Sequence, residues 1–185
     1  LAVLAASGAA MAQSSVTLFG IVDTAVGYVD NANAAGDSVY GLSTSGNATS
    51  RLGFRGVEDL GGGLKAGFWL EGEVFGDNGN ANGFNFQRRS TVSLMGGFGE
   101  VRMGRELTPS YSKTSSYDLF GQTGIGQFMG WTGNWYGIDG DSGNALRSSN
   151  MISYYTPNFS GFTAGLGYGF DEKADTTNSK KGRYV

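Results

Sequence analysis

Residues 50–71 read SRLGFRGVEDLGGGLKAGFWLE, and this stretch decides the fold class. Apolar and charged residues alternate on both sides of its glycine run. Leu52 and Phe54 share one face of the first segment, and Arg51 and Arg55 share the other. A period of two places successive side chains on opposite faces of a β-strand, and glycine adopts the positive φ angles that a tight reversal needs. The stretch therefore predicts a β-hairpin with one apolar and one charged face.

The second segment of the hairpin repeats this division. Its apolar face carries Leu64, Ala66, Phe68, Leu70 and Val74, and its polar face carries Lys65, Trp69, Glu71 and Glu73. A soluble sheet shows such alternation when its apolar face packs on a core, and a membrane barrel shows it when that face meets lipid. The rest of the chain distinguishes these two environments.

The composition favours a β-protein with many tight turns. Glycine accounts for 33 of 185 residues, far above the usual share of about 7%. Cysteine and histidine are both absent, which excludes a disulfide scaffold, thiolate chemistry and the commonest general base and metal ligand. The net charge of −3 provides no basic field for nucleic acid. We therefore expect no nucleic-acid partner, no metal site and no cofactor.

The first residues, LAVLAASGAAMAQSS, read as the end of a signal peptide. An uncharged stretch rich in Ala and Leu precedes the small-residue pattern AMA, which is typical of a cleavage site. This predicts residues 1–12 as residual signal peptide, a mature start at Gln13, and export. Residues 13–185 are then expected to form the N-terminal part of a single barrel domain.

Short and long connections alternate along the chain. Strands are predicted over about residues 15–28, 49–59, 64–76, 84–95, 100–106, 149–157 and 162–170, and an eighth begins near residue 182. The turns DLGGG, GGFG and NFSG are short, whereas the polar stretch at about 30–47 and the connection at 107–146 are long. This asymmetry is typical of transmembrane barrels, with short periplasmic turns and long outer loops. The prediction is an all-β, antiparallel transmembrane β-barrel whose apolar face meets lipid.

Four stretches carry a resemblance to a known family. SSVTLFGIVDTAVGY, SRLGFRGVEDLGGGLKAGFWLE, RRSTVSLMGGFGEVRMGR and SYYTPNFSGF resemble the general porins of Gram-negative outer membranes, those of β-proteobacteria above all. The resemblance implies a sixteen-stranded barrel that assembles as a homotrimer, with a third loop folded into the lumen. About half of the strands are present, so the chain is expected to be the N-terminal half of a porin. A water-filled passive diffusion channel for small hydrophilic solutes and inorganic ions follows, surrounded by outer-membrane lipid and lipopolysaccharide.

The resemblance also implies a pore constriction in which wall arginines face an acid on the inward loop. The matching positions are Arg51, Arg88 and Arg147, and Asp118 is the candidate acid on the loop at 107–146. Two or three arginines against one acid predict a preference for anions, because arginine stays charged at all physiological pH. Asp139 and Asp141 lie nearer the end of that loop, and its Trp131, Trp135 and Tyr136 are expected to pack it against the wall.

Strand parity leaves one of these positions open. Arg88 has the parity of Val92 and Leu94, on the expected lipid side, whereas Arg89 has the parity of the lumen. A bulge or a strand end would reconcile the two, and both are kept as candidates. Further candidates for lining the pore are Arg55, Arg89, Lys65 and Glu71. On an extended strand the Cα atoms of Arg51 and Arg55 lie about 13 Å apart.

Other classes of function are also considered. GDSG at residues 140–143 is similar to a serine-protease nucleophile segment, but that chemistry needs a histidine base and this sequence has none. An enzyme is therefore not expected. The main alternative is an outer-membrane barrel that acts as an adhesin or surface receptor without an open pore. A soluble exported β-sandwich is a third possibility.

Overall fold

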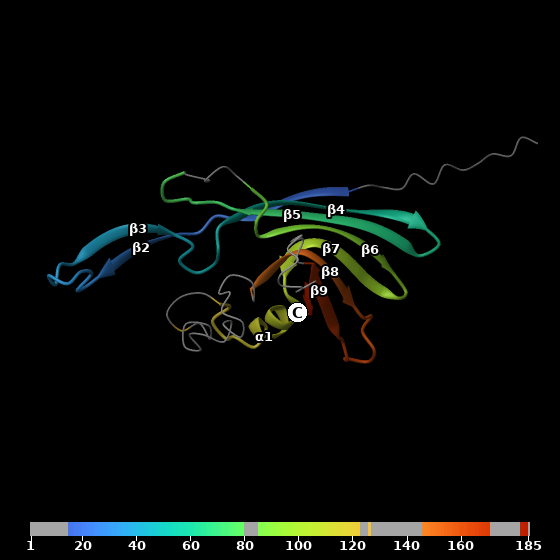
Figure 1. Ribbon diagram of the computed structural model, residues 1–185. Coiled ribbons are helices and arrows are strands. Elements are labelled where there is room, and N and C mark those ends of the chain that lie inside the picture. Colours follow the sequence, from blue (N-terminus) through green and yellow to red (C-terminus); the bar gives the residue numbers. More distant parts are fainter. Residues whose placement is uncertain (1–14, 80–84, 123–125, 127–145, 171–181, 185) are drawn as a thin grey trace, which may run out of the picture.

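The computed structural model describes residues 15–79, 85–122, 126, 146–170 and 182–184. They form a curved, eight-stranded antiparallel sheet in the order β1-β4-β5-β6-β7-β8-β9-β10 (Figure 1). The strands are β1 (Ser15–Ile21), β4 (Arg51–Gly61), β5 (Leu64–Glu73), β6 (Arg89–Gly96), β7 (Gly99–Leu107), β8 (Arg147–Tyr155), β9 (Gly165–Phe170) and β10 (Gly182–Tyr184). Within the described part of the chain, no helix is long and apolar enough to cross a membrane. The predicted all-β, antiparallel class is confirmed.

The quoted hairpin forms as predicted. Arg51 pairs with Glu73, Arg55 pairs with Trp69, and the ladder continues to Asp59 and Lys65 before a bulge shifts the register. Gly61, Gly62 and Gly63 take φ angles of 84°, 61° and 82°, which side chains with a Cβ rarely adopt. The glycine run therefore allows the reversal.

The two faces of the sheet differ in chemistry as the sequence predicts. Most side chains on the convex face are apolar and remain exposed, with exposed fractions of 64% for Leu18, 54% for Val92 and 58% for Leu166. We call this the apolar face, and the opposite one, which carries Arg51, Arg55 and Glu71, the charged face. An apolar surface extending from β1 to β9 is far larger than a soluble monomer normally exposes. It has the character of a barrel wall that faces hydrocarbon.

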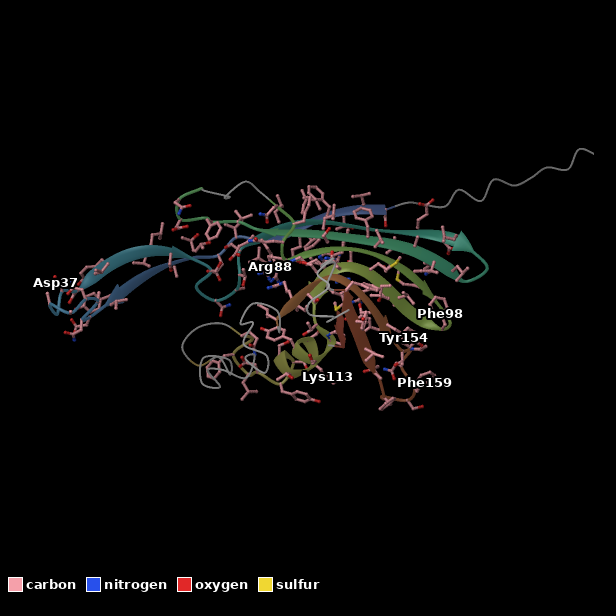
Figure 2. All side chains as sticks on the ribbon, in the orientation of Figure 1. Asp37, Arg88, Phe98, Lys113, Tyr154 and Phe159 are labelled. Carbon is pink, nitrogen blue, oxygen red and sulfur yellow. The ribbon has the colours of Figure 1, made fainter. Side chains whose placement is uncertain are left out.

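Aromatic side chains gather at the end of the sheet where the turns are short. Phe98, Tyr154 and Phe159 lie together at that end (Figure 2), and Phe162 lies in the same turn as Phe159, with which it forms a β-bridge. The Tyr154 hydroxyl donates a hydrogen bond to the carbonyl oxygen of Phe98 at 2.6 Å. Girdles of this kind occur where a transmembrane barrel meets the membrane–water interface.

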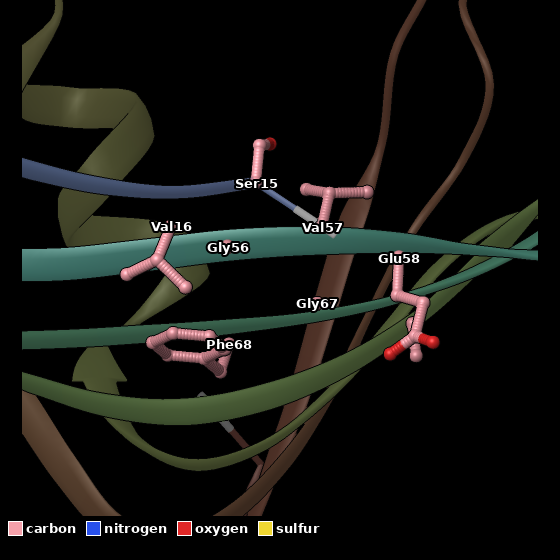
Figure 3. Close-up of a pocket in the computed structure, with 8 residues that line it drawn as sticks. Ser15, Val16, Gly56, Val57, Glu58, Gly67 and Phe68 are labelled. Carbon is pink, nitrogen blue, oxygen red and sulfur yellow. The ribbon is translucent and has the colours of Figure 1, made fainter. Parts of the chain in front are cut away.

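The outer surface also contains a shallow hollow between β1, β4 and β5 (Figure 3). Gly56 lines it, and a Cβ built on Gly56 would stand 2.6 Å from the ring of Phe68. The absence of that Cβ lets the ring lie flat across the neighbouring strand, so this hollow is a packing feature of the apolar face.

The predicted polar connection at about 30–47 is wrong in part, because it contains a strand. β3 (Val39–Thr44) pairs with β2 (Thr24–Val29) in a hairpin that projects beyond the main sheet (Figure 1). The rings of Tyr28 and Tyr40 pack at 4.8 Å between centroids. Tyr40 and Leu42 already alternate with polar or small residues, and the many polar neighbours hid this short pattern.

The base of this hairpin is tied down by Asp23. Its carboxylate accepts hydrogen bonds from the backbone N–H groups of Gly46, Asn47 and Ala48 at 2.7–3.1 Å. These donors, led by Ala48 and Asn47, hold the pKa of Asp23 below its ordinary value. The fully buried Ser50 hydroxyl accepts from the Asp23 N–H and donates to the Asp23 carbonyl.

A short helix, α1 (Pro109–Ser115), follows β7 and lies on the concave, charged side of the sheet (Figure 1). Thr108 caps its N-terminus by accepting from the Tyr111 N–H, and Pro109 occupies its first turn. The helix packs against β9, where a Cβ on Gly165 would lie 3.3 Å from Pro109. The connection after β7 thus starts by turning inward over the charged face.

Candidate functional site

The charged face holds a hollow of about 260 Å³ near the end of the sheet that carries the long connections. Arginine predominates among the charged residues that line it, and Ser112 of α1 borders it. The five arginines are Arg51, Arg88, Arg89, Arg102 and Arg147, and the two acids are Glu71 and Glu106. Figure 2 shows Arg88 on the side of the sheet that faces α1. These lining residues carry a clear excess of positive charge.

Glu71 lies at the centre of the first group of these charges. Its Oε1 is 2.8 Å from the Nε of Arg88 and 3.8 Å from the Nε of Arg51. The Nε of Arg147 donates to the backbone carbonyl of Arg88 at 2.9 Å. The structure therefore brings together the three arginines that the family resemblance implied, from three different strands or strand ends.

The backbone geometry of β6 explains why Arg88 and Arg89 both reach this face. Arg89 is the first residue of β6 and stands opposite Glu71 in the ladder. Arg88 precedes the strand, although its N–H still bonds the Glu71 carbonyl at 3.1 Å. Strand parity ends at Arg89, so the Arg88 side chain is not constrained to the apolar face. Of the two explanations considered, a bulge or a strand end, the geometry supports the strand end.

A second group surrounds Glu106, whose side chain is only 5% exposed. Its carboxylate accepts from Arg102 at 3.0 Å and from the Ser153 hydroxyl at 2.6 Å, and Arg89 lies 3.8 Å away. Arg102 also donates to Glu100 at 2.8 Å. Sequence reasoning missed Glu100, Arg102 and Glu106. Their shared parity within the predicted strand at 100–106 is the signal that would have found them.

Aromatic rings separate some of these arginines. The Arg55 guanidinium lies 5.3 Å from the ring centroid of Phe19 and 5.1 Å from that of Trp69. Arg89 lies 4.6 Å from Trp69. Arg55 lines a neighbouring hollow that shares Trp69, Arg89 and Arg102 with the first. Two of the four further candidates, Arg89 and Glu71, thus border the main hollow, and Arg55 borders its neighbour.

Lys65 lies apart from both hollows. It is on the charged face at the short-turn end of β5, opposite Asp59 and Met95. Its exposed side chain lines neither hollow. Of the four further candidates for lining the pore, Lys65 is therefore the one that borders neither hollow.

Asp118 caps a turn that follows α1. It accepts from the backbone N–H groups of Phe120 and Gln122 at 2.9 and 3.0 Å, and from the Gln122 amide at 2.6 Å. That glutamine also accepts from the Tyr111 hydroxyl at 3.2 Å, and burial raises the pKa of Tyr111. These hydrogen bonds shape the turn itself, and a contact between Asp118 and the wall arginines stays a prediction.

Several predicted residues lie outside the described part of the chain. They are the signal peptide at 1–12, Asp139, Asp141, Trp131, Trp135 and Tyr136. Among the described residues, no cluster of three His, Cys, Asp or Glu is placed to hold a metal ion. The chemistry that the main hollow offers is an excess of arginine side chains over carboxylates.

The whole sequence, residues 1–185, matches the family model described as Gram-negative porin. The chain belongs to the Gram-negative porin family. Members of this family are channels rather than enzymes, so the fold and class expected from the four resembling stretches are confirmed.

Individual relatives agree with this assignment. The chain is 70% identical over its full length to outer membrane porin protein 32 of Delftia acidovorans and covers 52% of that protein. It is 38% identical over 93% of its length to an outer membrane porin protein of Bordetella pertussis, covering 48% of it. Among solved structures, the anion-selective porin from Comamonas acidovorans aligns with a TM-score of 0.78 and 69% identity, over 88% of this chain and 48% of that one. The chain therefore spans about half the length of the porins it matches.

Proposed function

We propose that the porin containing these residues forms a water-filled, passive diffusion channel for small hydrophilic solutes and ions in the outer membrane, with a preference for anions. The observation that carries the proposal is the pairing of Arg51 and Arg88 with Glu71, with Arg147 bonded to the Arg88 backbone, beside an open hollow. The relatives named as outer membrane porins, one of them anion-selective, support the same conclusion.

The magnitude of the electrostatic effect is sufficient for selectivity. A unit charge 4 Å from an ion is worth about 1 kcal/mol even in bulk water, which enriches a counter-ion about fivefold. Low-dielectric walls increase that value, and salt screens it. The excess of arginines over glutamates in the hollow therefore favours anions at its narrowest point, although the whole chain carries a net charge of −3.

We infer that the connection at 107–146 is the constriction loop. The inward turn of α1 and the position of Ser112 at the hollow support this role for the start of the loop. Asp118 remains the proposed acid of the loop. Its hydrogen bonds within its own turn support a second role, which is to hold the shape of the loop beside the arginines.

Two features of the surroundings complete the proposal. The exposed apolar face and its aromatic end fit outer-membrane lipid and lipopolysaccharide as the surrounding partners. A homotrimer is proposed from the family resemblance. Light scattering on the detergent-solubilised complete porin tests this state, and a monomer would contradict it.

The test of the channel is the reversal potential in a planar bilayer with a KCl gradient. The complete porin is compared with the variants Arg51→Gln, Arg88→Gln and Arg147→Gln. Each substitution removes one positive charge from the hollow, so each should shift the reversal potential toward cations. Lys65→Gln is the matched control, because Lys65 is on the same face of the sheet and lines neither hollow.

The outcomes test the arginine site and the channel function separately. An anion-selective channel whose selectivity is unchanged in all three variants would contradict the arginine site and leave the channel in place. A folded porin without any conductance would contradict the channel and favour the adhesin or receptor alternative.

A further inference from the structure

Trp69 contacts three charged groups on this wall. The guanidinium groups of Arg55 and Arg89 lie over its ring, at 5.1 and 4.6 Å from the ring centroid. The ring of Phe19 packs edge-on against it at 4.9 Å. Its indole N–H donates to Oε2 of Glu71 at 3.0 Å. One side chain thus touches two arginines and the acid that pairs with two more.

The strand register explains this position. Trp69 stands directly opposite Arg55 on β4 and opposite Thr91 on β6, and Arg89 is one step along the same face. All of these side chains share the charged face because they have the same parity in adjacent strands. The indole therefore lies between the two guanidiniums within the wall.

Arg55 depends on this contact more than Arg89 does. Arg89 has Glu106 at 3.8 Å, whereas none of the ion pairs between described residues includes Arg55. An aromatic face attracts a guanidinium electrostatically, and an arginine without such a partner samples many rotamers. Phe19 and Trp69 are thus what orients the Arg55 charge on the wall.

The indole also influences Glu71. Its N–H occupies Oε2, so that Oε1 is the atom that meets Arg88 at 2.8 Å and Arg51 at 3.8 Å. The ring and its N–H together connect the arginines of both hollows.

We propose that Trp69 is a positioning residue for anion selectivity, which holds the Arg55 and Arg89 guanidiniums apart and pointed along the charged face. This inference rests on the proposed channel function. Trp69 does not bind the permeating ion in this scheme; it acts through the arginines whose direction it fixes.

The experiment measures the chloride-to-potassium permeability ratio of the complete porin from reversal potentials. Trp69→Leu removes the aromatic face and should lower the ratio by about twofold or more. Trp69→Phe keeps a ring face and should retain most of the wild-type ratio. Phe68→Leu is the matched control, because Phe68 is the next residue of β5 and lies on the apolar face, and it should leave the ratio unchanged.

A double-mutant cycle distinguishes positioning from simple filling of space. Arg55→Gln should lower the ratio in the wild-type background and have a clearly smaller effect in the Trp69→Leu background, because the Arg55 charge there is already misplaced. Additive effects of the two substitutions would overturn the proposal. If Trp69→Leu does not assemble, the unbranched Trp69→Met variant takes its place in the cycle.

The remaining outcomes show whether the proposed channel function or only the positioning role of Trp69 is wrong. A wild-type channel without anion preference refutes the proposed function and this inference with it. An anion-selective wild type whose ratio is unchanged by Trp69→Leu refutes only the positioning role. A ratio that falls as far in Trp69→Phe as in Trp69→Leu also refutes it, since the effect would then come from the lost N–H bond to Glu71.

Discussion

Two glutamates on the same face of one sheet have opposite electrostatic surroundings. Glu106 meets Arg102 and lies near Arg89, and Glu100 pairs with Arg102, so that two acids balance two arginines. Among the described residues, Glu71 is the one carboxylate paired with Arg88 and Arg51, and Arg147 is bonded to the Arg88 backbone. Glu106 is also the more buried of the two, with a side-chain exposure of 5% against 12%.

This difference indicates two separate roles for arginine on the wall. A balanced and buried cluster holds strands together, because each charge there has a partner and little field extends into the hollow. A cluster with excess positive charge leaves a field that an ion can sense. The Glu106 cluster is therefore expected to serve stability, and the Glu71 cluster to serve selectivity.

The largest expected effect comes from breaking the balanced cluster. Glu106→Gln leaves Arg102 with one of its two carboxylates and weakens the bond from Ser153. We expect a loss of about 3 kcal/mol in the free energy of unfolding, because the most buried carboxylate of the cluster loses its charge and Glu100 alone is left to balance Arg102 and Arg89. Denaturant unfolding of the complete porin in detergent measures it.

Glu100→Gln is the comparison for this prediction. Glu100 also pairs with Arg102, but its side chain is 22% exposed, so its removal should cost about 1 kcal/mol or less. Equal losses in the free energy of unfolding would show that the deeper burial of Glu106 does not make it more important for stability than Glu100.

The next effect separates the two clusters by selectivity. Glu71→Gln removes the only carboxylate in contact with Arg88 and Arg51 among the residues that the structure describes, so the anion preference should rise by up to about fivefold. Reversal potentials in a KCl gradient provide the measurement. The rise should exceed that in Glu106→Gln, where Glu100 still balances Arg102.

Lys65→Gln provides the control for position along the wall. Lys65 is on the same face but lines neither hollow, so its neutralisation should change the permeability ratio by less than about twofold. If Lys65→Gln shifts the ratio as strongly as Glu71→Gln does, the narrow region lies elsewhere.

The sequence predicted the faces of the wall better than the contacts across it. Alternation placed Leu52 and Arg51 on opposite faces, because a strand has a fixed period of two. The same rule failed at Arg88, where the strand has not yet begun. It also gave no warning of β3, because Tyr40 and Leu42 provide only a short apolar pattern inside a polar stretch.

The sequence pattern could not predict which residues make up each cluster. Glu71 was a candidate for lining the pore, but its contact with Arg88 depends on the end of β6 and on the strand register. Glu106 lay unnoticed within a predicted strand, since its importance comes from Ser153 on β8, 47 positions away. Periodicity identifies the face of a residue, and only the ladder identifies its neighbours.

The smallest effect concerns a carboxylate whose described partners are backbone amides rather than arginines. The backbone donors from Gly46, Asn47 and Ala48 lower the pKa of Asp23 below its ordinary value of 3.8. A carboxylate with a lowered pKa in the folded state contributes stability that is present above its ordinary pKa and is lost as the pH falls through the lowered one. We therefore expect the amides of Gly46, Asn47 and Ala48 to lose protection from hydrogen exchange in that acidic range.

Asp23→Asn isolates this contribution, because it removes the charge and keeps one acceptor oxygen. At neutral pH the variant should show weaker protection of these three amides than the wild type, and the difference should disappear once Asp23 is protonated. Its permeability ratio should equal that of the wild type, since Asp23 lines neither hollow on the charged face. A shift in selectivity would mean that the base of the β2–β3 hairpin influences the pore. Asp23 would then contribute to selectivity as well as to stability, and the separation of these two roles seen for Glu106 and Glu71 would not hold for it.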